Sequence, residues 1–350
     1  MKSARLEKKV TIYDIAERAG TSPSTVGSVL NGSWRNRRIS AARAEIIKGV
    51  AEKMGYAPNM QASALRNDRS RMIGMILPMY ENRYFSAIAE IFERESRSRG
   101  LLPMTSCTRR DPSLELSTVR QMLAYQVDRI VCTGATDPDE IARLCQRYGV
   151  PTINLDLPGS VAPSIISNNY SGAYKLTAEL IHRAEKKGTP WRDDLLFVGG
   201  RPHDHNTSER VRGFRDALLA ANVEPIEANI LTCGYATVKA ERALEAHVGK
   251  IGRVPTAIFV NSTISLEGVI RWLGHHHRQA LDTIIFGCFD WDPFAQFVAK
   301  NLLSVRQDAP AMLNAMFEII DNDLDPGASL IEIEPTVIIE DGTAGPEAAD

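Results

Sequence analysis

Long apolar runs are absent from the 350-residue sequence, and none approaches the roughly 20 residues that a membrane-spanning helix needs. The charged segment from Met1 to Val10 lacks the apolar stretch of a secretory signal peptide, so we expect a cytoplasmic protein with no membrane partner. Cysteine is also scarce. The five cysteines lie far apart without a Cys-x-x-Cys pair, which argues against a disulfide framework and against a zinc finger.

Motifs of catalysis and cofactor binding are missing too. The sequence has no nucleophile elbow and no phosphate-cradling glycine motif, so we expect neither an enzyme nor a cofactor. Two histidine-rich pieces invite a metal interpretation, namely His203-Asp204-His205 and His275-His276-His277. Neither has a companion cluster at ligand spacing, so the sequence predicts no metal site.

What is present is an uneven distribution of charge. The formal net charge is −2, yet residues 1 to 71 carry 14 Lys and Arg against 6 Asp and Glu, a net of +8. The remainder carries 27 against 37, a net of −10. A basic head on an acidic body predicts a polyanionic partner for the head alone.

The basic head contains three short helical patterns. Apolar residues recur at helical spacing over residues 12–19, stop at a Gly-Thr pair, and resume over residues 26–30. Ser22 can cap the second helix, and Pro23 suits its first position, where a missing N–H costs nothing. A third helix follows Ser40, with an expected buried stripe of Ile46, Ile47, Val50, Ala51 and Met54. The pattern predicts an all-α helix-turn-helix domain.

The second helix of such a domain can enter the major groove of DNA with its first residues nearest the base edges. Short hydroxyl side chains would then face the duplex, namely Ser22, Ser24, Thr25 and Ser28. The loop after this helix carries three guanidinium groups that can reach phosphates, those of Arg35, Arg37 and Arg38. The alternative interpretation of this run is a solvated loop.

An ordered string runs through the head: Val10-Thr11-Ile12-Tyr13-Asp14-Ile15-Ala16, Ala19-Gly20, Ser22-Pro23-Ser24-Thr25-Val26, Val29-Leu30-Asn31-Gly32 and Gly55-Tyr56-Ala57-Pro58-Asn59. This string resembles the lactose/galactose-repressor family of bacterial transcription regulators. The resemblance implies double-stranded operator DNA as a partner. From the helix pattern, the basic loop and the resemblance together, we expect DNA contacts from Thr11, Tyr13, Ser22, Pro23, Ser24, Thr25, Ser28, Asn31, Arg35, Arg37, Arg38, Ser40, Asn59, Ala62 and Leu65. The resemblance also implies that residues 59–66 form a hinge helix when two subunits meet on an operator, with Leu65 as an apolar wedge in the minor groove.

Two features of the head depart from the family pattern. The family usually has Ser-Arg after Thr-Val in the recognition helix, whereas this chain has Gly27-Ser28. A basic base-reading side chain is lost, and a helix-weakening glycine is gained. The loop before Ile39 is longer than in the lactose repressor. We hypothesise that its arginines take over part of the lost affinity for DNA.

From Met72 onward, short β-rich runs alternate with helical segments. We expect a helix over residues 85–99 and strands over residues 72–78, 101–105, 129–132, 153–155, 195–198, 257–260 and 283–286. This alternation predicts an α/β body with parallel sheets covered by helices on both faces. The resemblance implies a two-lobed, periplasmic-binding-protein-like body.

Four segments follow from these patterns and from the resemblance. We expect a helix-turn-helix DNA-binding domain over residues 1–58 and a hinge helix with linker over 59–71. An effector-binding and dimerisation domain of two lobes is expected over 72–340, and a flexible tail over 341–350.

Ligands bind parallel sheets beyond the carboxyl ends of the strands, so the polar and aromatic residues there form the candidate effector site. We expect this site to contain Asn82, Tyr84, Phe85, Asn168, His203, Asn206, Arg210, Asn261 and Asp290. Amide, carboxylate and guanidinium groups pair with vicinal hydroxyls, which suits a sugar or sugar derivative.

The resemblance assigns effector-binding roles to Arg210, which begins an Arg-x-x-Gly-Phe segment, and to Asp290, which lies in Phe289-Asp290-Trp291-Asp292-Pro293. Arg83 stands where the family usually has proline. Without the resemblance, helix caps and core positions are the simpler explanation for Asn82, Asn168, Tyr84, Phe85 and Asp290.

Together with the resemblance, these patterns predict a DNA-binding transcriptional repressor, a homodimer whose operator affinity is controlled by a sugar-like effector. Two alternatives stay open: a free-standing sugar-binding protein, and an enzyme that uses Asp290, Asp292 and His203 as acid–base groups. The tail from Gly342 has no leucine heptads, which favours a dimer over a tetramer. The sequence does not specify the operator, the identity of the effector, or inducer against corepressor logic.

Overall fold

The computed structural model describes residues 10–56, 69–299, 302–324 and 327–339. The chain forms two compact units, Met1–Ser70 and Arg71–Asp350. We call them the head and the body and describe each by itself. No helix of the described residues is long and apolar enough to cross a membrane.

The described part of the head has three helices around one small core: α1 (Ile12–Arg18), α2 (Pro23–Leu30) and α3 (Ala41–Lys53). Side-chain oxygens of Thr11, Ser22 and Ser40 cap their first turns, which confirms the predicted starts of α2 and α3. The expectation that Ile46 is buried is wrong, since 52% of it is exposed. The core of the head is instead Ile15, Ala16, Val26, Val29, Ala44, Ile47 and Ala51.

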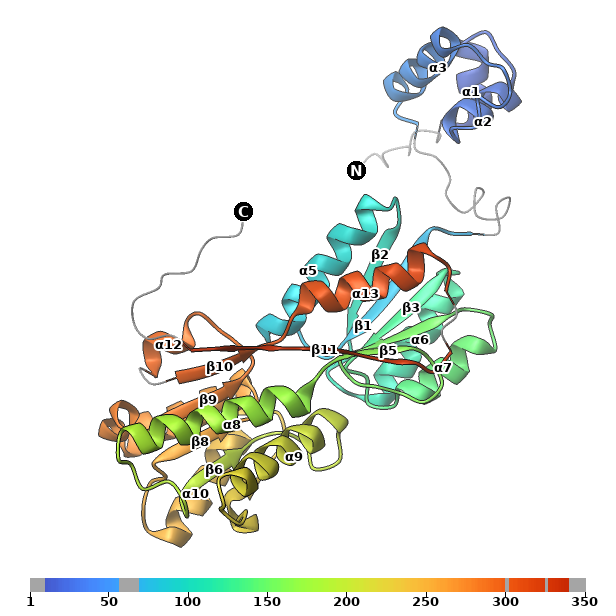
Figure 1. Cartoon of the computed structure of the whole chain (residues 1–350). Helices are drawn as coiled ribbons and strands as arrows, with labels where there is room; N and C mark the ends of the chain where they lie inside the picture. The colour runs from blue at the N-terminus through green and yellow to red at the C-terminus, as the bar shows by residue number, and fades with distance from the viewer. Residues whose placement is uncertain (1–9, 57–68, 300–301, 325–326, 340–350) are drawn as a thin grey trace, which may run out of the picture. The chain divides into compact units, whose positions relative to one another are not determined.

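The described residues of the body form two six-stranded sheets, each the centre of one lobe (Figure 1). The first lobe has the strand order β11-β5-β4-β3-β1-β2, and all its pairings are parallel. Its strands are β1 (Met72–Leu77), β2 (Leu102–Cys107), β3 (Arg129–Thr133), β4 (Thr152–Leu155), β5 (Ser164–Ser167) and β11 (Leu330–Ile333).

The second lobe has the strand order β12-β10-β9-β8-β6-β7, and only the β10–β12 pairing among these described strands is antiparallel. Its strands are β6 (Leu195–Val198), β7 (Ile230–Leu231), β8 (Ala257–Val260), β9 (Ile285–Phe289), β10 (Leu302–Arg306) and β12 (Thr336–Ile338). The expected strand at 283–286 begins later, because a 3-10 turn over Arg278–Asp282 ends at Thr283.

Helices cover both faces of each sheet. In the first lobe, α5 (Arg83–Ser98) and α13 (Ala309–Asp321) lie side by side on one face, and α6 (Pro112–Ala124) and α7 (Pro138–Gln146) cover the other (Figure 1). In the second lobe, α8 (Asn169–Lys186) and α9 (His205–Ala220) pack against one face. The other face is covered by α10 (Thr237–Ile251) and α11 (Thr263–His276), and the short α12 (Ala295–Val298) precedes β10. This arrangement confirms the predicted α/β body.

The chain passes between the lobes three times. It enters the second lobe after β5, returns to the first from β10 into α13, and crosses again between β11 and β12. Each lobe has its own apolar core. In the second lobe, Phe197 stacks on Phe259 with ring centroids 4.9 Å apart, and Phe214 packs edge-on against both. The cavity described below lies between these two lobes, where strands of both sheets end.

Candidate functional site

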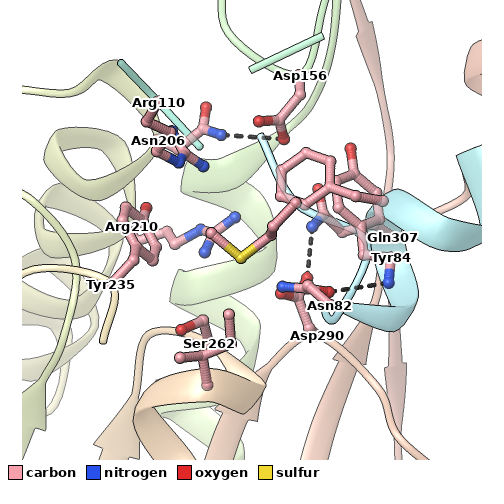
Figure 2. Close-up of a pocket in the computed structure, with 13 residues that line it drawn as sticks. Asn82, Tyr84, Arg110, Asp156, Asn206, Arg210, Tyr235, Ser262, Asp290 and Gln307 are labelled. Carbon is pink, nitrogen blue, oxygen red and sulfur yellow. Dashed lines mark hydrogen bonds between the residues drawn. The ribbon is translucent and has the colours of Figure 1, made fainter. Parts of the chain in front are cut away.

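The candidate effector site is a cavity between the two lobes of the body (Figure 2). The first lobe contributes residues that follow β1, β2 and β4, and the second contributes residues that follow β6, β7, β8, β9 and β10. The lining is Met79, Asn82, Tyr84, Phe85, Arg110, Asp156, Asn206, Arg210, Tyr235, Ser262, Ile264, Asp290 and Gln307. The cavity lies at the carboxyl ends of parallel strands, where the sequence predicts the effector to bind.

Six of the nine predicted effector residues line this cavity: Asn82, Tyr84, Phe85, Asn206, Arg210 and Asp290. Local structure explains how α5 presents three of them. Asn82 is the N-cap of α5, and its Oδ1 accepts a hydrogen bond from the backbone N–H of Tyr84 at 2.9 Å. The cap and the first turn therefore carry side chains from the end of β1 directly into the cavity.

A hydrogen-bonded network holds the buried side chain of Arg210 in place. Its Nε donates to Oδ1 of Asn169 at 2.8 Å, and one terminal nitrogen donates to the backbone oxygen of Asn261 at 2.7 Å. The guanidinium carbon also lies 3.6 Å from the ring centroid of Phe289. This geometry leaves the other terminal nitrogen of Arg210 as the donor available to a ligand.

The network continues from Arg210 into the first lobe. Asn169 donates to Asn206 at 3.0 Å, and Asn206 donates to Oδ1 of Asp156 at 3.3 Å. Asp156 follows β4 of the first lobe, whereas Arg210 and Asn206 belong to α9 of the second. Side-chain hydrogen bonds thus connect the two lobes across the cavity.

The two carboxyl groups of the cavity have perturbed acidities. Burial raises the pKa of Asp290 from 3.8 to about 6, although Arg210 and hydrogen bonds from Gln307 and Asn82 favour the charged form. Burial likewise raises the pKa of Asp156, and Arg110 and Arg210 oppose that rise.

Backbone conformation at the cavity is unusual. Arg110, Asp156 and Asp290 adopt positive φ angles of 56°, 75° and 90°, a region that residues other than glycine seldom occupy. Each such residue costs on the order of 1 kcal/mol or more, and such costs cluster at ligand sites. The three positions place charged side chains in the cavity at the expense of local stability.

Several lining residues were not expected from the sequence: Arg110, Asp156, Tyr235, Ser262 and Gln307. Asp156 and Gln307 come just after β4 and β10, so their position at strand ends is the sequence signal that points to them. Arg110 and Tyr235 meet across the cavity, with the guanidinium carbon 5.0 Å from the ring centroid. That contact depends on the packing of the lobes and leaves no local signal in the sequence.

Three predicted effector residues are not part of the cavity lining: Asn168, His203 and Asn261. Asn168 is the N-cap of α8, and its Oδ1 accepts from Ser171 N–H at 2.9 Å. His203 is exposed in the turn before α9, where Asp204 provides the cap. Asn261 is fully buried behind Arg210 and contributes its backbone oxygen to it. Neighbouring positions, Asn169 and Asn206, carry the polar contacts instead.

The candidate nucleic-acid interface of the head is the start of α2. Ser22 caps this helix by accepting from Thr25 N–H at 3.2 Å, Pro23 is its first residue, and Ser24 is exposed. The prediction that Ser28 faces DNA is wrong, because its side chain is buried and donates to the backbone oxygen of Ser24 at 2.8 Å. The accessible hydroxyls are therefore confined to the first turn.

The basic loop between α2 and α3 is a series of turns and is mostly exposed. Its ends are joined by a backbone hydrogen bond from Ile39 N–H to Trp34 oxygen at 3.0 Å. Trp34 packs against the core of the head, and the guanidinium carbon of Arg35 lies 5.1 Å from its ring centroid. Arg35, Arg37 and Arg38 are all exposed, as contact with phosphates requires.

The remaining predicted DNA-binding residues have these positions. Tyr13 is 69% exposed on α1, and Thr11 forms a capping box with Asp14 at the start of that helix. Asn31 follows α2 as its C-cap, and exposed Ser40 caps α3. The predicted hinge contacts lie outside the described residues: Asn59, Ala62 and Leu65.

Within the described ranges, no group of three His, Cys, Asp or Glu side chains could hold a metal ion. His276 bonds instead to the backbone oxygen of Trp272 at 3.0 Å and stacks on its ring.

Comparison with known proteins places both units. A profile of bacterial regulatory proteins of the lacI family matches residues 11–59, and a profile of periplasmic binding proteins and the sugar binding domain of the LacI family matches residues 70–296. The ribitol operon repressor of Klebsiella aerogenes is 55% identical over 195 residues, which cover 55% of this chain and 72% of that protein. The sucrose operon repressor of Klebsiella pneumoniae is 28% identical over 320 residues, covering 91% of this chain and 93% of that protein.

Among solved structures, the lac repressor dimer bound to operator and the anti-inducer ONPF has a TM-score of 0.79 at 19% identity, covering 95% of this chain and 98% of that chain. The Cra regulator of Pseudomonas putida in complex with fructose 1-phosphate has a TM-score of 0.68 at 21% identity, covering 77% and 98%. At these identities the likeness concerns the fold.

A helix-turn-helix head followed by a two-lobed body with a polar cavity defines the class of ligand-responsive DNA-binding regulators. Within that class, this chain belongs to the lacI family of bacterial regulatory proteins. The family and the fold predicted from the sequence are thereby confirmed, and the chain is a DNA-binding transcription regulator.

Proposed function

We propose that this chain is a transcriptional repressor whose affinity for operator DNA is controlled by a small polyhydroxylated effector in the interlobe cavity. The convergence of donors and acceptors from both lobes carries the proposal: Asp156 from the first lobe, Arg210 and Asp290 from the second. A hydroxyl group both donates and accepts, so this set suits a polyol.

The relatives support the repressor assignment. The ribitol and sucrose proteins are both named operon repressors, and the lac repressor of the solved structure is a dimer bound to its operator. We propose that this chain also acts as a homodimer, because two-fold protein symmetry matches a pseudo-palindromic operator with two half-sites. The relatives are named as regulators, so we propose that Asp156 and Asp290 bind a ligand rather than convert it.

The mechanism is a shift between arrangements of the lobes. An effector held by Asp156 on one side and by Arg210 and Asp290 on the other favours the arrangement in which all three can contact it. The effector binds the DNA-competent state and the other state with two different free energies. The difference between these two free energies sets how far the effector can change the affinity for DNA. A release of DNA on binding defines an inducer, and a gain defines a corepressor.

The test begins with duplexes selected by the full chain from a randomised DNA library. Affinity for the selected duplex is measured with and without sugars, alditols and nucleobases, and thermal stability is followed for the same compounds. A ligand at about 100 times its dissociation constant adds about 2.7 kcal/mol to the free energy of unfolding. We expect at least one polyhydroxylated compound to stabilise the protein and to change DNA affinity.

Variants place the ligand. Arg210→Ala should abolish the response to the effector and keep binding to the selected duplex. Arg212→Ala is the matched control, because Arg212 lies on the same helix but its side chain pairs with Glu209 and stacks on Tyr170. If the effector still changes the DNA affinity of the Arg210→Ala protein, the cavity is not the effector site. Turnover of the bound compound on prolonged incubation would favour an enzyme instead.

A further inference from the structure

The charged side chains of the cavity limit which effectors it can accept. Four lining residues carry charge when ionised: Arg110, Arg210, Asp156 and Asp290. Their charges sum to zero. Arg210, Asp156 and Asp290 are each exposed by less than a tenth of their surface, so little solvent screens them from a ligand. The cavity is therefore rich in polar groups but has no net charge to offer to an ion.

The charges of these four groups balance, although the groups are not joined in ion pairs. In the described part of the chain, no ion pair within 4.0 Å connects either arginine to either aspartate. Arg210 donates to an amide and a backbone oxygen, and Asp156 and Asp290 accept from the amides of Asn206 and Gln307. Each charged group keeps unused donors or acceptors. Nε of Arg110, for example, is buried without a partner.

Other groups of positive potential at the cavity already have partners within the protein. The helices α5, α9 and α11 all begin there, and free helix N-termini attract anions. Their first turns are already capped by side chains, those of Asn82, Asp204 and Ser262. Nearby Arg201 pairs with Asp204 at 3.4 Å. The surroundings thus add no uncompensated cation to the four lining charges.

We propose that the effector is an uncharged polyol, an alditol or a free monosaccharide, and that the cavity rejects the phosphorylated form. This inference rests on the proposed function and makes its ligand class specific. A hydroxyl can donate to Asp156 or Asp290 and accept from Arg110 or Arg210, so one polyol uses both kinds of group. A phosphate only accepts, and its oxygens would meet two buried carboxylates that repel it.

The test compares matched ligands on the full-length protein. Calorimetric titration measures the affinities of ribitol and ribitol 5-phosphate, and of D-ribose and D-ribose 5-phosphate. We expect each tight-binding uncharged compound to bind at least about tenfold more tightly than its phosphate. The affinity of the uncharged compound should change little between about 0.05 and 0.5 M salt, because salt screens interactions with charged ligands.

Asp156→Asn provides the diagnostic variant. Removal of one carboxylate leaves the cavity with a net positive charge, so discrimination against the phosphate should shrink by about tenfold or reverse. Asp156→Glu, which keeps the charge, is the matched control and should retain the preference. Binding to the selected duplex shows that each variant is folded.

The outcomes separate this inference from the function on which it rests. A phosphate that binds wild-type protein more tightly than its uncharged partner, and changes DNA affinity, would overturn the inference and leave the effector role intact. An absence of binding by both kinds of compound, across pentoses, hexoses and their alditols, would overturn the proposed effector role and this inference with it. An unchanged preference in Asp156→Asn would show that charge balance is not the cause.

Discussion

Replacement of Asp290 by asparagine should stabilise the body at neutral pH, even though Asp290 is a candidate ligand for the effector. The carboxyl group is only 7% exposed, and burial raises its pKa from 3.8 to about 6. Folding therefore favours the protonated form. The stability that this preference contributes is fully present below about pH 4 and is lost as the pH rises through about 6.

The magnitude follows from the shift in pKa. A rise of about two units at about 1.36 kcal/mol each gives roughly 3 kcal/mol of destabilisation by the ionised group at pH 7. Asparagine has nearly the same shape, and its Oδ1 can still accept the hydrogen bond that Gln307 donates. We therefore expect Asp290→Asn to raise the free energy of unfolding by up to that amount at pH 7 and by little near pH 4.

The assay is denaturant unfolding of the full chain across this pH range, with the transition of the body followed by tryptophan fluorescence. Three of the four tryptophans lie in the body and serve as probes, namely Trp191, Trp272 and Trp291, and Trp272 is buried in the second lobe. Glu245→Gln, which removes an exposed carboxylate on α10, is the control. A difference between wild type and Asp290→Asn that stays constant from about pH 4 to 7 would refute the argument from burial.

Three further predictions concern other contacts. Arg83→Ala removes a 2.8 Å ion pair with Asp292 that joins the lobes, and because Arg83 is exposed we expect under about 1 kcal/mol of lost stability but weaker effector binding by titration. Gly213→Ala should destabilise the body by about 1–3 kcal/mol in urea unfolding, because a Cβ there would lie 2.5 Å from the backbone oxygen of Tyr170. Replacement of the loop arginines Arg35, Arg37 and Arg38 by alanine should reduce the dependence of DNA affinity on salt concentration. Titration of the selected duplex at several salt concentrations measures this dependence.

Controls and contradicting results accompany each of these. Gly249→Ala, at a helical glycine with open space around its Cβ position, should be neutral or stabilising, and a loss equal to that of Gly213→Ala would contradict the close-packing argument. An Arg83→Ala protein with unchanged effector affinity would exclude a role for the ion pair in closing the lobes. An unchanged salt slope in the triple variant would remove the loop from the DNA interface.

The head could be predicted well because its signals are local. A cap such as Ser22, a proline at the next position and apolar residues three and four apart act within one turn of helix, so the order of residues contains the outcome. The position of Ser28 was harder to predict. Whether a helical serine faces solvent or bonds to the preceding turn depends on how closely α2 packs on its neighbours.

The cavity was only half predictable, for two physical reasons. A helix cap and a ligand-binding residue both require a polar side chain just after a strand, so Asn82 and Asn168 look alike in the sequence although only Asn82 lines the cavity. Arg110 reaches the cavity through a turn in which it and Arg109 both have positive φ angles. Such turns favour glycine and asparagine, so two arginines give no sign of one.

The same contacts that were hidden from the sequence are those that connect the lobes. Arg110 lies against Phe85 of its own lobe and Tyr235 of the other, with 5.8 Å and 5.0 Å from its guanidinium carbon to the two ring centroids. The series of hydrogen bonds that runs from Arg210 through Asn169 and Asn206 to Asp156 also passes from one lobe to the other at the cavity. A ligand that binds Arg110 or Asp156 therefore contacts side chains that also join the lobes. Recognition of the effector and movement of the lobes depend on one set of side chains, so variants that change the specificity of this cavity should also change how strongly the effector controls DNA binding.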